Sequence, residues 1–307
     1  MLKTLHLELT SRCILACPAC PRTIFTKKFN RPFPKFDLDL DDLENFLNCN
    51  TGKDIDHFQL EGNHGDLIYY PHLFEFIARW RTTKKFTFIT NGSNRDTVWW
   101  YEFSKLLTKD DKVIFSVDGF DDTNHLYRVN SNWESIINAI KIVANSDAHT
   151  VWRTIIFKTN EHQIDTIKEF AYSLGVDEYA TELTHRFGDD SKFKPKKFID
   201  IANNLKPLIN AGCRDNKLLY ISADGYIYPC CYIVTYNTLH STEFWKNKEV
   251  YSIKNKSLDD FLNQQHIEKF IDRTEDNYDN AYKVCQTNCN ANTQEIKLYT
   301  ILKNERL

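Results

Sequence analysis

From Leu5 to Leu183 the chain alternates between short strand patterns and longer helical patterns. Such an alternation is typical of strands joined by right-handed crossover helices, which together form a parallel sheet. It therefore predicts an α/β fold, and functional groups are expected at the carboxyl ends of its strands. The six expected strands are Leu5–Leu9, His57–Leu60, Phe86–Thr90, Val113–Gly119, Val151–Phe157 and Tyr179–Leu183.

Three cysteines follow the first expected strand directly. Cys13, Cys17 and Cys20 have the spacing Cys-x3-Cys-x2-Cys, with no fourth ligand nearby. A structural zinc site is normally closed by four ligands, whereas an iron–sulfur cubane held by three cysteines keeps one iron open to another molecule. The motif favours such a cluster. Half of a zinc knuckle, part of a disulfide framework or scattered buried thiols are the alternatives.

The composition narrows the compartment and the partners. The chain has 307 residues and nine cysteines but no pattern of a signal peptide, which favours reduced thiols in the cytoplasm. No apolar run reaches the roughly 18 residues of a membrane span. A net charge of -3 and a pI near 6.4 disfavour a nucleic-acid partner.

The cysteine motif resembles the radical S-adenosylmethionine (radical SAM) superfamily, and the loop after the second expected strand extends the resemblance. Gly65 and Asp66 stand where the family has the last Gly-Glu of a Gly-Gly-Glu-Pro motif. Leu67 replaces the proline, and Asn63 and His64 are insertions relative to the motif. A carboxylate at Asp66 can still bind the ammonium group of SAM.

Three further segments are similar to the family and occur in its order. They are Thr90-Asn91-Gly92 after the third strand, Val113–Gly119 with Ser116 and Asp118, and Arg128, at the position of a family arginine that can meet the carboxylate of SAM. The resemblance implies these SAM-binding residues: Gly62, Asn63, Gly65, Asp66, Asn91, Ser116, Asp118 and Arg128.

The resemblance also implies a partial (βα)6 barrel and a chemistry. Cys13, Cys17 and Cys20 would hold a [4Fe-4S] cluster whose open iron is chelated by SAM. Reduction of the cluster by an external one-electron donor, such as flavodoxin or ferredoxin, would cleave SAM to a 5′-deoxyadenosyl radical. This radical would then take a hydrogen atom from the substrate.

The second half of the chain carries another group of cysteines. Leu218 to Cys230 reads as a β-hairpin with an Asp-Gly turn at Asp224-Gly225. Together with the hairpin, the cysteines resemble the auxiliary-cluster segment of Twitch and SPASM domains, and four ligands suit the single cluster of a Twitch domain better. Zinc is the alternative. The four implied ligands are Cys213, Cys230, Cys285 and Cys289, while Cys231 and Cys49 are interpreted as packing residues.

We expect two domains. The loop at 188–197 breaks the alternation, so residues 1–190 are assigned to the radical SAM core and 191–307 to a small α+β domain with the auxiliary [4Fe-4S] cluster. Helical patterns at Phe198–Leu208 and around Leu258–Ile271, and a tail at Gln294–Leu302, are expected in the second domain.

The substrate is less constrained than the cofactors. Pro21–Phe36 is basic and rich in phenylalanine, which could hold a phosphate or a stacked base, although a loop whose phenylalanines pack on the barrel is the simpler interpretation. This segment favours an anionic or sugar-like small molecule, which the auxiliary cluster would help to oxidise by accepting an electron.

Two alternatives stay open. One is a peptide-modifying maturase, disfavoured because Cys13 lies too close to Met1 for an added recognition domain; the other is a non-catalytic zinc or electron-transfer protein. No catalytic acid or base is assignable, although Glu182, His185 and Arg186 follow the sixth strand.

Overall fold

One sheet of eight strands organises the part of the chain that the computed structural model describes, namely residues 2–182, 184, 191–195, 219–234 and 248–265. The strand order is β6-β5-β4-β3-β2-β1-β7-β8; β1 to β6 pair in parallel with all their neighbours, and β7 pairs in parallel with β1. The expected α/β fold with six consecutive parallel strands is therefore confirmed. The strands are β1 (Thr4–Leu7), β2 (His57–Leu60), β3 (Lys85–Thr90), β4 (Lys112–Ser116), β5 (His149–Ile155), β6 (Glu178–Glu182), β7 (Leu219–Ile221) and β8 (Ile227–Tyr228).

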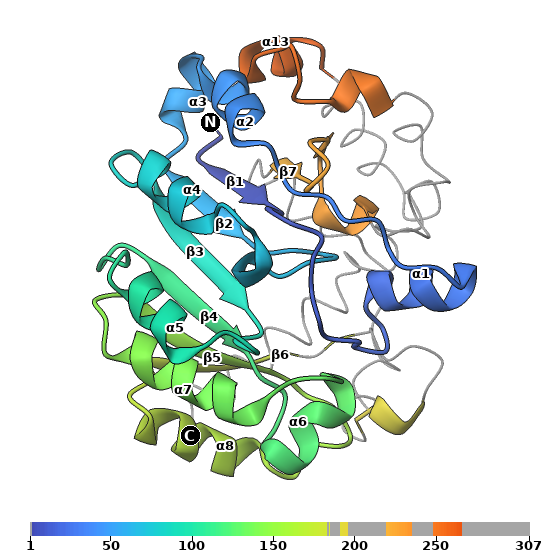
Figure 1. Cartoon of the computed structure of the whole chain (residues 1–307), viewed down its shortest axis with the longest axis vertical. Helices are drawn as coiled ribbons and strands as arrows, with labels where there is room; N and C mark the ends of the chain where they lie inside the picture. Colours follow the sequence, from blue (N-terminus) through green and yellow to red (C-terminus); the bar gives the residue numbers. More distant parts are fainter. Residues whose placement is uncertain (1, 183, 185–190, 196–218, 235–247, 266–307) are drawn as a thin grey trace, which may run out of the picture.

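Helices cover the outer side of the sheet. Figure 1 shows α4, α5, α7 and α8 along this side, while the carboxyl ends of the strands point toward the side where α1 lies. The helices are α1 (Pro21–Phe29), α2 (Leu40–Leu47), α3 (Asn50–Asp54), α4 (Leu73–Trp80), α5 (Thr97–Ser104), α6 (Asp121–Tyr127), α7 (Trp133–Ala144), α8 (Ile164–Ser173) and α13 (Leu258–Asn263). Short 3-10 turns occur at η1 (Leu67–Tyr69), η2 (Ser191–Phe193), η3 (Cys231–Val234) and η4 (Lys248–Tyr251).

The helices form where the sequence supplies an apolar face and a cap. In α4, Leu73, Phe76 and Ile77 lie on one face at helical spacing and are buried against the sheet. The side chains of Asp39 and Asp96 accept backbone N–H bonds at the starts of α2 and α5, where four N–H groups otherwise have no partner in the helix. Apolar periodicity and caps together therefore fix the bounds of these helices.

The first strand is buried on both sides. Leu5 and Leu7 are fully buried in the main apolar core, and the polar side chains that alternate with them, His6 and Glu8, are also almost fully buried. Successive side chains of a strand point to opposite faces, so the leucines face the apolar core and the buried polar side chains lie on the other face. The chain after β1 continues into the loop that carries Cys13, Cys17 and Cys20.

The predicted hairpin forms and joins the barrel sheet. β7 and β8 pair in antiparallel fashion, and Gly225 adopts a φ of +79° in the turn, a conformation that favours glycine. β7 also pairs in parallel with β1, with Leu219 opposite Leu5, which the sequence pattern does not predict. The hairpin of the cysteine-rich half is thus an extension of the sheet of the first half.

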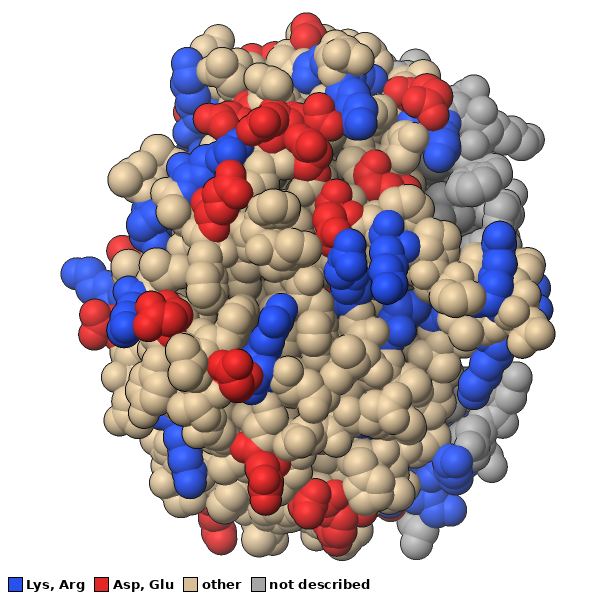
Figure 2. Space-filling model, viewed as in Figure 1, with Lys and Arg blue, Asp and Glu red and all other residues tan. Residues whose placement is uncertain are grey.

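The segment Pro21–Phe36 differs from the expected long loop, because its first nine residues form α1. Phe25 is buried and contacts Phe29 and Phe33 of the same segment, and packing of these rings on the barrel stays a prediction. Lys27 and Lys28 lie in the last turn of α1, and basic side chains predominate on this part of the surface (Figure 2).

Some predicted elements differ in detail from the structure, and others lie outside the described residues. Cys49 occupies the N-cap position of α3 without a side-chain capping bond and packs against the apolar core, and α6 was not expected. Cys213, His185, Arg186, Cys285, Cys289, Phe198–Leu208 and Gln294–Leu302 lie outside the described residues. The division at residue 190 stays a prediction. None of the helices described here has the length and apolar character of a membrane span.

Candidate iron–sulfur and SAM site

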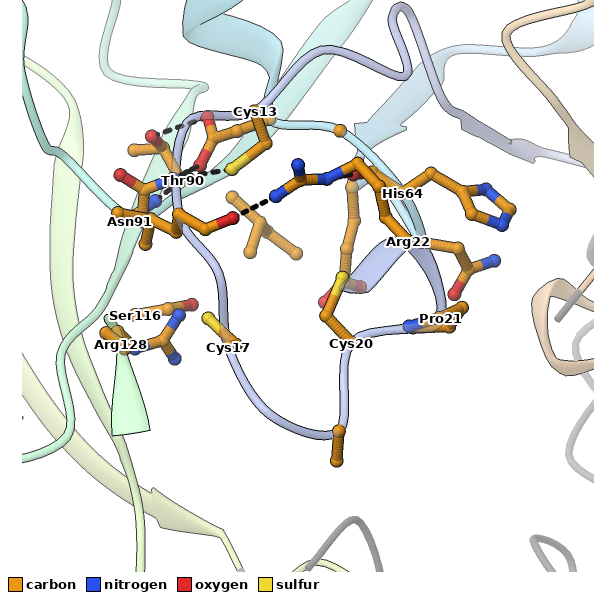
Figure 3. A pocket seen from close by; sticks show the side chains of 18 of the residues that line it. Cys13, Cys17, Cys20, Pro21, Arg22, His64, Thr90, Asn91, Ser116 and Arg128 are labelled. Carbon is orange, nitrogen blue, oxygen red and sulfur yellow. Dashed lines mark hydrogen bonds between the residues drawn. The ribbon is translucent and has the colours of Figure 1, made fainter. Parts of the chain in front are cut away.

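A cavity at the carboxyl ends of the parallel strands gathers the predicted site residues of the first half of the chain. Cys13, Cys17 and Cys20 lie around it, and Figure 3 shows their sulfur atoms together with Asn91, Ser116 and Arg128. Of the eight predicted SAM-binding residues, seven line this cavity: Gly62, Asn63, Gly65, Asp66, Asn91, Ser116 and Arg128. Asp118 is absent from the lining and lies behind Arg128.

The three cysteines fit an iron–sulfur cluster by their chemistry. All three are free, part-buried thiols, and burial raises the pKa of Cys13 to about 12 and that of Cys17 to about 11. A thiol in such a site keeps its proton unless a metal takes the place of that proton. Among the described side chains no three His, Cys, Asp or Glu converge on one metal ion.

Arg22 stabilises the loop that carries Cys13, Cys17 and Cys20, a structural role that the sequence did not predict. Arg22, in the first turn of α1, donates from Nε to the carbonyl of His64 over 3.1 Å and from Nη2 to the carbonyl of Leu15. Figure 3 shows this side chain reaching across the cavity wall. Arg22 therefore links the cysteine loop to the loop after β2, rather than offering its charge to a phosphate.

Asp66 connects the loop after β2 to the end of β3. Its carboxylate accepts hydrogen bonds from the Thr90 hydroxyl at 2.8 Å, the Asn91 backbone at 2.7 Å and the backbone of Ile68 at 3.2 Å. Asn91 Nδ2 also donates to it and lies 3.8 Å from the sulfur of Cys13. Burial raises the pKa of Asp66, and these hydrogen bonds oppose the shift. Asp66 is thus placed at the predicted position, with much of its accepting capacity already used.

Gly65 brings the same loop against the residues before the first cysteine. A Cβ at this position would lie 1.8 Å from the carbonyl oxygen of Thr10, so no side chain fits. The backbone N–H of Asp66 donates to the carbonyl of Arg12 over 2.9 Å. The family-like glycine is therefore needed for close approach of two backbones.

Glu8 binds the backbone of the loop after β2, a role that the sequence did not predict. It is fully buried and accepts from the backbone N–H groups of His64 at 2.6 Å and Gly65 at 3.0 Å, and from the Tyr220 hydroxyl at 2.5 Å. Burial raises the pKa of Glu8, but the charge of His64 and the hydrogen bonds outweigh it, and the net pKa is lowered. A glutamate within the alternating Leu5–Leu9 pattern was the available signal.

Arg128 and Asp118 form a buried ion pair on the opposite side of the cavity. Arg128 Nε lies 2.8 Å from Asp118 Oδ2, and neither of these buried atoms meets the geometry of a hydrogen bond. Burial raises the pKa of Asp118, with Arg128 opposing the shift. An arginine has five donors, and no other ion-pair partner of Arg128 is found in the described part of the chain. Its remaining donors suit an anionic group such as the carboxylate of SAM.

Arg153 of β5 is a second cavity-lining cation that the sequence analysis did not name. Its Nη2 lies 3.2 Å from Glu61 Oε1 and 3.1 Å from Ser116 Oγ, and its Nη1 lies 3.7 Å from Glu182. Glu182, which sequence reasoning placed after the sixth strand, is the last residue of β6. A lone arginine within an apolar strand run was the signal.

The segment around Cys231 contacts the loop after β2, in addition to the contact between Tyr220 and Glu8. Asn63 donates from Nδ2 to the carbonyl of Cys231 over 2.7 Å. Burial lowers the pKa of His6, but contact with Cys231 and Glu61 outweighs it, so the net pKa is raised. The predicted ligand Cys230 is part-buried and accepts from the backbone of Tyr232 at 3.3 Å. Cys231 thus lies against both Cys230 and His6, a contact that lowers the pKa of its thiol to about 5, and its assignment as a packing residue stays a prediction.

Comparison with solved structures identifies the fold. SuiB of Streptococcus suis bound to its precursor peptide SuiA is 13% identical, with a TM-score of 0.64, over 94% of this chain and 71% of that chain. SuiB bound to S-adenosylmethionine is 16% identical, with a TM-score of 0.59, over 94% and 72%. The enzyme anSMEcpe with bound AdoMet and the Cp18Cys peptide is 12% identical, with a TM-score of 0.62, over 99% and 98%. This chain has the radical SAM fold.

A family model matches one segment of the second half. The profile of SPASM, an iron–sulfur cluster-binding domain, matches residues 213–290. The matched range begins at Cys213 and includes Cys230, Cys285 and Cys289. The chain therefore combines a radical SAM fold with a SPASM segment, as the resemblance implied, and the [4Fe-4S] and SAM cofactors predicted from the sequence are supported. No curated protein matches the chain.

Proposed function

We propose that this chain is a radical SAM enzyme of the SPASM type that modifies a peptide or protein. The observation that carries the radical SAM part is the convergence, in one cavity, of the three motif cysteines with Asp66, Asn91 and Arg128. A structural metal site would need none of these later residues. When bound, the cluster and SAM supply one-electron reductive cleavage and hydrogen-atom abstraction.

The chain's own residues divide the work around these groups. Cys13, Cys17 and Cys20 would hold the SAM-binding cluster, and Asp66 with Gly62 and the rest of its loop would face the amino end of SAM. Arg128, held in place by Asp118, would meet the carboxylate of SAM. Arg153 and Glu61 would lie toward the substrate, because they line the same cavity from the barrel interior.

The second cluster would be held by Cys213, Cys230, Cys285 and Cys289. Its expected role is to accept an electron from the substrate radical, which makes the net reaction an oxidation. The division into residues 1–190 and 191–307, the external flavodoxin- or ferredoxin-like reductant and the cytoplasmic location remain predictions in the same account.

The peptide substrate replaces the preference for a sugar-like small molecule, which no comparison supports. SuiB and anSMEcpe are similar to this chain and are both solved with peptides bound. In addition, Arg22 is occupied by backbone carbonyls, so part of the basic character that favoured an anionic small molecule has a structural role.

The test is stimulation of SAM cleavage by fractions of a host-cell extract. The anaerobically reconstituted protein, with dithionite and SAM, is given either a fraction of peptides and small proteins or a fraction of metabolites, and 5′-deoxyadenosine is measured. We expect stimulation by the peptide fraction that is lost after proteinase K treatment. Stimulation by the metabolite fraction alone would contradict a peptide substrate and favour a small molecule.

A further inference from the structure

A second cavity lies beside the SAM cavity, on the other side of His64. It has a volume of about 330 Å³, which falls in the range of small-molecule and side-chain pockets. His64 lines both cavities, so the two are neighbours through a single side chain. The loop after α1 and the β7–β8 hairpin supply most of its lining residues.

Five of the fifteen residues that line this cavity are phenylalanine or tyrosine. Phe33 stacks on the ring of His64, with ring centres 4.5 Å apart and an interplanar angle of 14°. Phe25 packs edge-on against Phe33 at 5.1 Å and is buried. On the hairpin side lie Tyr226 and Tyr228, and Phe36 is 38% exposed at the edge. Such rings offer faces and edges to another aromatic ring.

The charges around the cavity balance. Arg31 lies over the ring of Phe25 at 5.4 Å, and Lys248 lies over the ring of Tyr226 at 4.6 Å. Against these two cations stand the carboxylates of Glu8 and Asp224. Glu8 is occupied by hydrogen bonds, and Asp224 accepts the Ser222 hydroxyl at 2.5 Å. Because these carboxylates offset the two cations, the cavity attracts a phosphate less than a purely basic site would.

We propose that this cavity binds an aromatic side chain of the peptide substrate and thereby places a neighbouring residue of that peptide in the SAM cavity. The inference rests on the proposed function for the identity of the peptide. It also gives a role to the phenylalanine-rich segment Pro21–Phe36, since Phe25, Phe33 and Phe36 all line the cavity.

The experiment uses the reconstituted full-length protein and N-acetyl-L-phenylalaninamide as the probe, with binding followed by saturation-transfer NMR. N-acetyl-L-leucinamide is the apolar comparison, and adenosine 5′-monophosphate is the nucleotide comparison. The variants are Phe36→Ala and Tyr226→Ala, both at part-exposed positions. Tyr172→Ala is the matched control, because Tyr172 is 46% exposed and lies on α8, outside the lining of the cavity.

We expect saturable binding of the phenylalanine probe that is tighter than that of the leucine probe. Loss of one wall ring should weaken it about fivefold in Phe36→Ala and in Tyr226→Ala, and Tyr172→Ala should leave it unchanged. No saturable binding, or equal binding in all variants, would overturn the proposal. Tighter binding of the nucleotide that depends on Phe36 would also overturn it and assign the cavity to a nucleotide. Saturable binding of the phenylalanine probe, without stimulation of SAM cleavage by the peptide fraction, would support an aromatic-binding site and contradict the proposed peptide substrate.

Discussion

The two sides of the SAM cavity differ in what their charged side chains bind. On the side of β1 to β3, the carboxylates of Glu8 and Asp66 are buried and accept bonds from the chain's own N–H and O–H groups. On the side of β4 and β5, Arg128 and Arg153 meet carboxylates and line the cavity. The first side is built to hold loops in place, and the second has donors to offer a ligand.

This comparison has a physical basis. A carboxylate that accepts three or four hydrogen bonds from backbone and hydroxyl groups has little capacity left for a ligand. A guanidinium with five donors is not exhausted by one carboxylate. Changes on the first side should therefore act on stability and on the position of the loop that faces the amino end of SAM, whereas changes on the second side should act directly on SAM binding.

The largest effect is expected where neither side can compensate, at the cysteines between them. Cys17→Ser removes one of three thiolates, so the cluster that binds SAM should not assemble. We expect loss of detectable 5′-deoxyadenosine formation and a fall of about half in the iron content, because the auxiliary cysteines are intact. The matched control is Cys49→Ser, at a part-buried cysteine outside the cavity, which should keep both properties.

The next largest effect tests the ligand-facing side. Arg128→Met leaves Asp118 buried without its partner, and breaking such a pair costs about 3–5 kcal/mol of unfolding free energy. The double variant Arg128→Met/Asp118→Asn should recover much of the stability but not the affinity for SAM, measured by equilibrium dialysis.

The control for this pair is Arg79→Met. Arg79 makes ion pairs with Asp41, Glu44 and Glu75 at the surface, where such pairs contribute little. We expect a small change in stability and none in SAM binding. If the double variant bound SAM as well as the wild type, Arg128 would have only a structural role.

A smaller effect, dependent on pH, is expected on the loop-holding side. The pKa of Glu8 is lowered in the folded protein, so its carboxylate contributes stability above its unfolded value of about 4.5, and this contribution is lost as the pH falls through the folded pKa. Glu8→Gln should therefore be less stable than the wild type by about 2 kcal/mol at pH 7. The gap should narrow when chemical denaturation is repeated at progressively lower pH. A gap that stays constant with pH would contradict the assignment.

The smallest effect concerns the link from the hairpin to the loop. Tyr220→Phe removes one hydrogen bond to Glu8, so we expect a loss of about 1 kcal/mol and faster hydrogen exchange at the N–H groups of His64 and Gly65. Tyr228→Phe, a buried tyrosine in the neighbouring strand, is the control and should not change exchange at these two positions. Equal exchange in the two variants would separate the hairpin from the SAM loop.

The sequence predicted what depends on local pattern and missed what depends on pairing across the chain. Strands β1 to β6 and the cysteine loop follow from periodicity and spacing, and each expected strand overlaps an observed one. The pairing of β7 with β1 joins residues 214 positions apart and the bond from Tyr220 to Glu8 joins residues 212 positions apart, which no periodicity reports. Asp118 was predicted at the ligand, but its position behind Arg128 depends on how α6 turns back toward β4.

The central claim is that this chain cleaves SAM at a cluster held by Cys13, Cys17 and Cys20. The most direct measurement is made on the anaerobically purified and reconstituted protein: iron, sulfide and zinc per chain, together with 5′-deoxyadenosine formed from SAM under dithionite. The account predicts about eight irons per chain, as two cubanes require, and release of 5′-deoxyadenosine. Zinc in place of iron, with no cleavage of SAM, would contradict it and make the chain a structural metal protein.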